Sequence, residues 1–339
     1  MKVAQLLLSH GNGGLEKHVR ELAVELFKAG NEVAVIGHPQ FLADLPDGIS
    51  RYPVSTGLSR LNPFLHLAIL RALRQFQPLL VHAQANKAAS VLSHLQRFLP
   101  AATVGTLHNI KRDTRAFHRL NHVITVSQQL AALFASGSHS VIYNGIANAV
   151  VPPCDLYRQF QLPADKPVFI AAGRLVSAKG FDMLLDAVDG LPLSLLLVGD
   201  GPAHDRLSSR ISQMASTTEV RLLGHRTDLA TLMAAADGVL ISSRREGFSY
   251  VFSEALMLGC PILSTDVPVA NEMLPAELLV AVDDAPDFRQ KLADLLALPD
   301  RWSALMSAPR HQAVNAMSLE AMRDKTLATY HAILARKPC

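Results

Sequence analysis

Short apolar runs recur along the chain, and most are followed by a turn and then by residues with helical spacing. We expect strands at residues 3–8, 33–37, 79–82, 103–107, 123–126, 141–143, 168–172, 195–198, 220–223, 238–241 and 261–264. We expect helices at residues 15–27, 228–236, 250–258, 293–298 and 319–334. Continuous apolar runs are typical of strands buried on both faces of a parallel sheet. Strands that alternate with helices form doubly wound sheets, so the pattern predicts an α/β fold.

The length of the chain indicates two domains. A chain of 339 residues exceeds one ordinary domain and suits two domains of about 150 residues each. Residues 146–166 contain Pro152, Pro153 and Pro163 and show little periodicity. We therefore expect the domain boundary in this stretch, near residue 150.

The bulk composition is that of a folded protein. Apolar residues make up 49% of the chain and aromatic residues 6%, which gives ample core and no sign of disorder. Cys154, Cys260 and Cys339 have no metal-ligand spacing and form an odd set, which favours a reducing cytoplasm. The first strand breaks too early for a signal peptide, and no apolar run reaches the roughly 20 residues that span a bilayer. We expect a cytoplasmic protein that is soluble or at most peripheral to the membrane.

Charge divides unevenly between the two halves. Residues 1–150 hold 14 Lys and Arg against 7 Asp and Glu, a net charge of +7, and residues 151–339 hold 18 against 22, a net charge of −4. The asymmetry predicts that the halves meet different partners. No nucleic-acid-binding motif accompanies the basic half, so we expect no nucleic-acid partner.

The stretch 58–76 combines apolar residues with Arg60, Arg71 and Arg74 and contains no acidic residue. Such a segment can lie on an anionic membrane or meet a lipid-linked acceptor. The alternative, which we favour, is an ordinary domain helix whose arginines are solvated.

Two features of the first half can carry chemistry. The turn at residues 9–14 joins a strand to a helix, and its glycines allow backbone to approach a phosphate closely. The turn lacks the G-x-G-x-x-G spacing and the lysine of a P-loop, which argues against a dinucleotide or ATP site, and it can also be a plain tight turn. His108 follows a strand directly, where it can donate to a sugar hydroxyl, take a proton, or simply bond to backbone.

In the second half, residues 244–268 read as a loop, a helix and a strand that follow a buried strand. Glu246 in the loop and Glu254 in the helix can face one crevice, where the amides of Tyr250 and Val251 can bind a phosphate. Glu254 can instead merely complement the helix dipole. Earlier in this half, Arg174 and Lys179 follow a strand, and two cations suit a diphosphate whose negative charge grows as its bond to a sugar breaks.

These residues also carry a resemblance. EGFSYVFSE followed by ALMLGCPIL resembles the Glu-x7-Glu motif of retaining family-4 glycosyltransferases, and GRLVSAKGFDMLLDA is similar to their GRL-x-x-x-KG block. Gly13, Gly14 and Glu16 match the GG-x-E pattern of the family, and His108 matches a histidine close to the transferred sugar. The resemblance implies the GT-B fold, with two Rossmann-like doubly wound domains facing each other across a cleft. The acceptor domain would be residues 1–150 and the donor domain residues 151–318, with a helix in 319–339 packing back onto the first domain.

The activity that the resemblance implies is retaining transfer of a hexosyl group from a nucleotide-diphosphate sugar, expected to be a UDP-sugar, to a glycan or lipid-linked acceptor. We expect bacterial lipopolysaccharide or exopolysaccharide synthesis at the inner face of the cytoplasmic membrane. No Asp-x-Asp triplet occurs, so no metal and no other cofactor is expected. The expected catalytic residues are His108, Glu246, Arg174 and Lys179. The expected donor-binding residues are Gly13, Gly14, Gly173, Arg174, Lys179, Gly199, Gly224, His225, Gly247, Phe248, Ser249, Tyr250, Val251 and Glu254. Glu16, Ser127 and Asn144 are expected on the acceptor side. Ser127 and Asn144 each follow a strand and match family positions, and their roles can instead be turn chemistry alone.

Two alternatives from other classes stay open. A sugar-nucleotide epimerase of the same fold would act on the donor without an acceptor, and would not need the Glu-x7-Glu spacing. A non-catalytic relative would bind nucleotide or a partner protein only, and would be free to lose part of the set found here. Ser249 and Phe252 occupy positions where the family more often has a glycine and an aliphatic residue, which leaves the donor sugar open.

Overall fold

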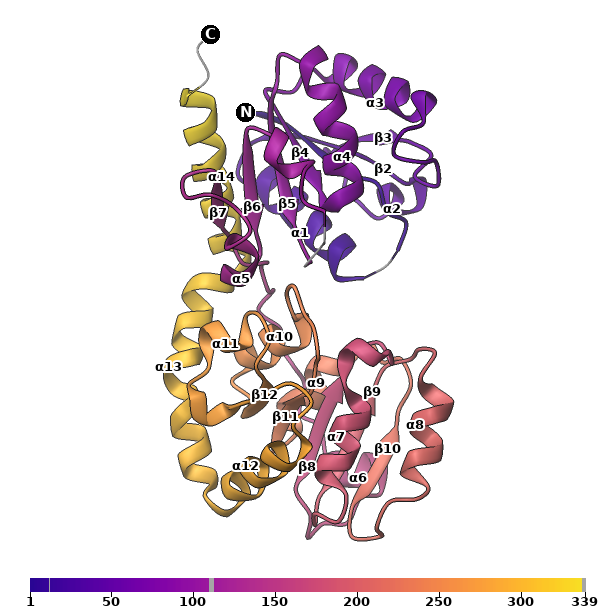
Figure 1. Cartoon of the computed structure of the whole chain (residues 1–339), viewed down its shortest axis with the longest axis vertical. Helices are drawn as coiled ribbons and strands as arrows, with labels where there is room; N and C mark the ends of the chain where they lie inside the picture. The colour runs from indigo at the N-terminus through magenta and orange to yellow at the C-terminus, as the bar shows by residue number, and fades with distance from the viewer. Residues whose placement is uncertain (12, 110–112, 337–339) are drawn as a thin grey trace. The chain divides into compact units, whose positions relative to one another are not determined.

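The computed structural model describes residues 1–11, 13–109 and 113–336 and divides into two compact units (Figure 1). Unit 1 contains Met1–Gly145 and Ala316–Cys339, and unit 2 contains Ile146–Asn315. These limits lie a few residues from the boundaries expected at 150 and 318. Asn12, in the turn after the first strand, and Cys339 lie outside the described residues.

Unit 1 is built on a seven-stranded sheet in the order β3-β2-β1-β4-β5-β6-β7, and every neighbouring pair is parallel. The strands are β1 (Lys2–Leu7), β2 (Glu32–Gly37), β3 (Ser50–Pro53), β4 (Leu80–Gln84), β5 (Ala102–Leu107), β6 (His122–Thr125) and β7 (His139–Val141). The apolar pattern does not predict β3, because this edge strand is half exposed and has the sequence SRYP. The strand order reverses between β1 and β4, and ligands bind at such switch points in doubly wound sheets.

The helices of unit 1 are α1 (Gly14–Lys28), α2 (Pro39–Ala43), α3 (Pro63–Phe76), α4 (Ala85–Leu95), α5 (Gln128–Ala131) and α14 (Leu319–Arg336), with short 3₁₀ segments at Gln96–Phe98 and Phe117–Arg119. Helices α1 and α14 pack together and share one core with β1, through side chains such as Leu22 and Met322. Helix α3 packs on α4, and α4 packs on β4 and β5. The last helix is therefore an integral part of the first unit's core.

Unit 2 contains a six-stranded parallel sheet in the order β10-β9-β8-β11-β12-β13. The strands are β8 (Val168–Ala172), β9 (Ser194–Val198), β10 (Glu219–Leu222), β11 (Gly238–Ile241), β12 (Ile262–Thr265) and β13 (Leu279–Val280). The order reverses between β8 and β11, so the switch point of this sheet lies at the carboxyl ends of these two strands. The α/β prediction of two doubly wound domains is confirmed.

The helices of unit 2 are α6 (Leu156–Phe160), α7 (Phe181–Val188), α8 (His204–Ile211), α9 (Leu229–Ala235), α10 (Tyr250–Leu258), α11 (Ala270–Met273), α12 (Ala285–Ala297) and α13 (Pro299–Met317), with 3₁₀ segments at Ser177–Lys179 and Ala276–Leu278. The sequence pattern predicts α10 with its observed ends, but it misses α13, which contains Pro309. Within the described residues, no helix is long and apolar enough to cross a membrane.

Candidate functional site

A paired cation and carboxylate lie at the switch point of unit 2. The Nζ atom of Lys179 is 2.5 Å from Oε1 of Glu246, and the two side chains are 21% and 10% exposed. The hydroxyl of Ser243 donates to the same carboxylate oxygen at 2.7 Å. Lys179 ends the 3₁₀ turn after β8, and Glu246 lies in the loop after β11. The two loops that follow the switch-point strands are therefore joined by a charged, partly accessible pair.

The close approach of these two loops depends on a glycine. Gly180 has φ of +64°, and a Cβ atom at this position would lie 2.0 Å from the carbonyl oxygen of Ser242. The hydroxyl of Ser242 donates to the carbonyl of Lys179 at 2.8 Å, which closes the contact from the other side. Any side chain at position 180 would push the loops apart and separate Lys179 from Glu246.

Three glycine turns lie side by side at the carboxyl edge of the same sheet. The amide of Gly173 donates to Val198 at 2.9 Å, and that of Gly199 donates to Gly224 at 2.8 Å. Gly173 and Gly199 have φ of +145° and +139°, and a Cβ on Gly199 would lie 1.9 Å from the carbonyl oxygen of Gly173. The turns after β8, β9 and β10 thus present backbone rather than side chains. Arg174 and His225, which follow two of these glycines, are exposed.

Helix α10 begins beside this edge, after the loop that carries Glu246. Ser249 is its N-cap, and the Ser249 hydroxyl accepts from the amide of Phe252 at 3.4 Å. The amides of Tyr250 and Val251 therefore lie at the positive end of the helix dipole, where an anion is favoured. Glu254 is partly buried and lies beyond the first turn, which contains no acidic residue. An interaction with the helix dipole alone therefore does not explain why a carboxylate stands at position 254.

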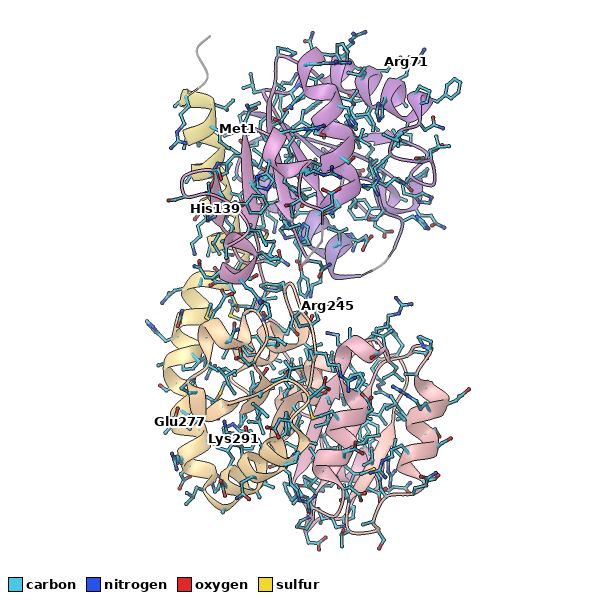
Figure 2. All side chains as sticks on the ribbon, viewed as in Figure 1. Met1, Arg71, His139, Arg245, Glu277 and Lys291 are labelled. Atoms are coloured by element: carbon cyan, nitrogen blue, oxygen red, sulfur yellow. The ribbon has the colours of Figure 1, made fainter. Side chains whose placement is uncertain are left out.

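The loop before α10 is fixed by arginine. Arg244 pairs with Asp182 at 2.8 Å and with Asp283 at 2.5 Å. The hydrogen bond to Asp182 raises the pKa of the Arg244 guanidinium, and the reciprocal bond holds the pKa of Asp182 below its usual value against the effect of burial. Arg245, next in sequence, is exposed and projects from the loop (Figure 2). Between Arg245 and α10, Gly247 is buried, and the Phe248 ring meets the Tyr250 ring edge-on, with centroids 5.3 Å apart.

In unit 1, Glu16 orders the glycine-rich turn after β1. Its carboxylate accepts from the Ser9 hydroxyl at 2.6 Å, from the Gly11 amide at 3.2 Å and from the Gly13 amide at 3.0 Å. Glu16 is only 4% exposed. The carboxylate therefore faces its own loop, where it fixes the backbone of Gly13 and the start of α1 at Gly14.

His108 heads a buried chain of side-chain hydrogen bonds. The Nε2 atom of His108 donates to Gln84 Oε1 at 2.8 Å, and Gln84 Nε2 donates to Gln5 Oε1 at 2.7 Å. Gln5 in turn donates to the hydroxyl of Tyr330 at 3.3 Å. Tyr330 belongs to α14, so the last helix takes part in holding a residue at the end of β5.

This series of hydrogen bonds continues beyond Tyr330. The Tyr330 hydroxyl bonds to His82 Nδ1 at 2.6 Å, and His82 Nε2 bonds to the Thr106 hydroxyl at 2.6 Å. With Gln84 oriented so that its carboxamide oxygen faces His108, that oxygen can only accept, so His108 carries its proton on Nε2 and presents an unprotonated Nδ1. Burial, followed by His18 and then His82, lowers the pKa of His108 well below its ordinary value. In this arrangement His108 can accept a hydrogen bond from a hydroxyl through Nδ1, and its partner is a side chain rather than backbone.

The remaining acceptor-side candidates are buried in unit 1. The hydroxyl of Ser127 caps α5 by accepting from the Leu130 amide at 3.4 Å. Asn144 is 2% exposed, and its Oδ1 has no hydrogen-bond partner within the described residues. The amide next to it, on Gly145, donates to the sulfur of Met322 in α14. Ser127 thus has a capping role, whereas Asn144 keeps an unused acceptor.

Comparisons with known proteins assign the two units to one family. Residues 12–149 match the model described as Glycosyltransferase Family 4, and residues 166–298 match the model described as Glycosyl transferases group 1. The chain belongs to the family-4 glycosyltransferases. The family-4 motifs noted in the sequence lie in both matched stretches, and the matched stretches fall in different units.

Two curated relatives of this family-4 chain come from Rhizobium meliloti. The lipopolysaccharide core biosynthesis glycosyltransferase LpsE is 31% identical over 180 residues, which cover 52% of this chain and 52% of LpsE. The lipopolysaccharide core biosynthesis glycosyltransferase LpsD is 26% identical over 310 residues, which cover 86% of this chain and 88% of LpsD. The match to LpsE therefore spans about half of that protein.

A solved structure gives the fold. Anabaena Alr3699/HepE in complex with UDP superposes with a TM-score of 0.82 at 21% identity, covering 98% of this chain and 100% of that one. The fold of this family-4 glycosyltransferase is therefore GT-B, as the sequence predicts.

The structure groups the predicted residues into two sets. Unit 2 gathers Gly173, Arg174, Lys179, Gly199, Gly224, His225, Glu246, Gly247, Phe248, Ser249, Tyr250, Val251 and Glu254 at or beside the carboxyl edge of its sheet. Unit 1 holds Gly13, Gly14, Glu16, His108, Ser127 and Asn144. Sequence reasoning does not single out Ser243, Gln84 or Tyr330, although a polar residue closing an apolar strand, such as Gln84, is a signal that can be read.

Proposed function

We propose that this chain is a retaining glycosyltransferase that moves a hexosyl group from a UDP-sugar to a glycan or lipid-linked acceptor. The observation that carries the proposal is the Lys179–Glu246 pair at the switch point of unit 2, between the glycine turns and the N-terminus of α10. Paired cations and helix-end amides suit a diphosphate, and carboxylates suit the hydroxyls of a sugar and a ribose.

The chemistry of each side chain suggests which part of the nucleotide sugar it binds. Arg174 and Lys179 bind the diphosphate together with the amides of Tyr250 and Val251, and Glu254 accepts from the ribose hydroxyls. Glu246 accepts from hydroxyls of the transferred sugar. The Anabaena protein of the same fold was solved with UDP and with UDP-glucose, which supports UDP as the nucleotide.

The proposed reaction proceeds on one face of the sugar. The bond between the anomeric carbon and the phosphate oxygen breaks, and UDP departs with the bonding electrons. The acceptor hydroxyl oxygen bonds to the anomeric carbon on the face that UDP leaves, and its proton passes to the departing phosphate oxygen. Arg174 and Lys179 stabilise the charge that grows on the diphosphate. We propose that neither a metal nor another cofactor takes part.

The names of the relatives suggest the kind of acceptor. Two of them are named for lipopolysaccharide core biosynthesis, so we propose a lipopolysaccharide or exopolysaccharide acceptor. Helix α3 supports contact with the inner face of an anionic membrane. Leu61, just before α3, is 69% exposed, and Phe64 and Leu67 on α3 are 75% and 42% exposed. The exposed Arg71 lies on the outer side of α3 (Figure 2). Exposed apolar side chains beside arginines suit an anionic lipid surface.

A thermal-shift panel of nucleotide sugars, followed by transfer assays with the best binder, tests the function. We expect Lys179→Ala and Glu254→Ala each to remove most transfer while the fold stays intact. Turnover like that of the unmodified protein in either variant would contradict the site. Conversion of the nucleotide sugar to an isomer without an acceptor would instead support the epimerase alternative, and nucleotide binding without turnover would support a non-catalytic protein.

A further inference from the structure

A basic pocket in unit 1 lies outside the residues assigned so far. Its cavity of about 220 Å³ is lined by Arg60 from the loop before α3, by Asn86, Ser90 and Ser93 from α4, and by Arg115 and Arg119 from the segment before β6. We call these six residues the basic pocket. An adjoining hollow of about 460 Å³ shares Arg60 and Asn86 with it and adds Lys87.

The basic pocket has a surplus of positive charge. Asp113 also lines the cavity, but it is held by Arg115, whose Nε and Nη2 atoms donate to the two carboxylate oxygens at 3.0 and 2.9 Å. In the part of the chain that the structure describes, neither Arg60 nor Arg119 forms an ion pair with a carboxylate. Between Asp47 and Asp113 the sequence contains eight Lys and Arg and no Asp or Glu. Asp113, which pairs with Arg115, is the only acidic residue between Asp47 and Asp155.

The polar wall of the pocket is pre-formed. Asn86, Ser90 and Ser93 follow the spacing of one helix face on α4. The Asn86 carboxamide donates to the carbonyl of Asp113 at 3.2 Å, which ties the segment bearing Arg115 to α4. In the loop before α3, the carbonyl of Arg60 accepts a hydrogen bond from His66 Nε2 at 2.8 Å. The segment that bears Arg60 and the segment that bears Arg115 are thus both held in place around one cavity.

The start of α4 strengthens the case for an anion. Its N-cap residue, Gln84, makes no capping bond, because its side chain is engaged with Gln5 and His108. The first turn holds no acidic residue, and Ala85 has φ of +65°. Burial, and then Arg60, lowers the pKa of Lys87, so a bound anion would favour the charged form of this lysine.

We propose that the basic pocket binds a phosphate group carried by the acceptor. One guanidinium group can donate two N–H bonds to two oxygens of the same phosphate. The Ser90 hydroxyl and the second N–H of the Asn86 carboxamide supply further donors from α4, whereas the Ser93 hydroxyl already donates to the carbonyl of Ser90 at 2.8 Å. A neutral glycan would not neutralise the positive charge of Arg60 and Arg119. The inference rests on the proposed transferase function and narrows its acceptor to a phosphate-bearing one, either a phosphorylated saccharide or a phospholipid head group.

Calorimetric titration of the full chain tests the pocket. The probes are glucose 6-phosphate, uncharged glucose, and vesicles of phosphatidylglycerol or phosphatidylcholine. We expect a phosphate-bearing probe to bind, and the Arg60→Gln/Arg119→Gln double variant to weaken that binding about tenfold or more. The matched control is Lys28→Gln/Lys325→Gln, which removes two cations of unit 1 that do not line the pocket, and we expect it to bind like the unmodified chain.

The probes separate the two sources of phosphate. Saturable binding of glucose 6-phosphate but not glucose supports a phosphorylated saccharide, and pocket-dependent binding of phosphatidylglycerol vesicles alone supports a lipid head group. Equal binding by the pocket variant and the control, or no binding of any phosphate-bearing probe, overturns the proposal. UDP-sugar binding is measured on the same samples. Its absence from the unmodified chain would refute the proposed function, whereas its retention in the pocket variant separates the pocket from the donor site.

Discussion

At the residue scale, Glu16 shows how a carboxylate can serve a site without facing a ligand. Its three donors all come from the turn after β1. We expect Glu16→Gln to lower the free energy of unfolding by about 1–3 kcal/mol, because a neutral amide replaces a charged acceptor and cannot satisfy all three donors. Urea denaturation measures the change. The control is Glu32→Gln, whose side chain is 70% exposed, and an equal loss in both variants would contradict the role of Glu16.

His18 makes stability depend on pH. Burial lowers its pKa to about 4, and neither ring nitrogen has a hydrogen-bond partner within the described residues. The unfolded chain, with an ordinary pKa near 6.5, therefore binds more protons between pH 4 and 6.5. The contribution of His18 to the free energy of unfolding is fully present above pH 6.5. It falls by roughly 3 kcal/mol as the pH drops toward 4. His82, whose pKa burial lowers to about 3, adds to the same trend.

The variant His18→Phe isolates this contribution. Phenylalanine does not titrate and leaves no buried nitrogen unpaired, so we expect a shallower loss of stability between pH 6.5 and 4.5. Urea denaturation at a series of pH values gives both slopes. Identical slopes in the variant and the unmodified chain would show that His18 is not held neutral in the fold.

Sequence reasoning finds ionic groups at strand ends better than it finds buried amides. Lys179 and Glu246 are recognisable, because charged residues after apolar runs stand out and because the family motif covers them. Gln5 lies inside an apolar run, and Tyr330 lies about 250 residues from its partner His82. Their hydrogen bonds depend on how β1, β4 and α14 meet, which no local pattern encodes.

At the scale of elements, one hydroxyl links α14 to buried polar side chains of the unit 1 sheet. The Tyr330 hydroxyl accepts from Gln5 and bonds to His82, and all three residues are fully buried. We expect Tyr330→Phe to cost roughly 2–4 kcal/mol of unfolding free energy, because two buried polar groups lose their partner. The control is Tyr157→Phe in unit 2, whose part-buried hydroxyl donates to the carbonyl of Lys166 at 3.2 Å. Similar losses in the two variants would contradict the importance of the buried chain.

Helix α3 offers a matched pair of leucines for the membrane proposal. Leu67 on α3 and Leu133, just after α5, are both 42% exposed. We expect Leu67→Ser to weaken binding to phosphatidylglycerol vesicles about fivefold, because an apolar side chain that enters the lipid surface is lost. Leu133→Ser should have no effect. Vesicle co-sedimentation measures both, and equal affinities would place the membrane contact elsewhere or nowhere.

Elements were predictable where their pattern was unbroken. The eleven apolar runs all correspond to strands, and α10 begins and ends where its spacing predicts. The structure extends the predicted helix at 293–298 back to Ala285, and the elements that it adds include β3, β13 and α13. These elements were missed because β3 is polar, β13 has two residues and α13 contains a proline.

At the scale of the whole molecule, the chain runs through unit 1, then through unit 2, and returns to unit 1 with α14. The length of the chain and the proline-containing stretch at residues 146–166 predict two units. The short helix α6 inside that stretch is not predicted, because one turn of helix capped by Asp155 leaves too little periodicity. Each unit carries its own switch point. Most of the candidate donor-binding residues gather at that of unit 2, whereas Gly13 and Gly14 lie in unit 1.

The central claim is that unit 2 binds the diphosphate of a nucleotide sugar through Lys179 and its ribose through Glu254. Calorimetric titration with UDP-glucose tests it most directly, with Lys291→Gln and Glu277→Gln as controls in the same unit (Figure 2). We predict that Lys179→Gln and Glu254→Gln each weaken binding at least about tenfold, whereas both controls bind like the unmodified chain. Unchanged affinity in the Lys179 and Glu254 variants, or no binding of any nucleotide sugar to the unmodified chain, would contradict the claim.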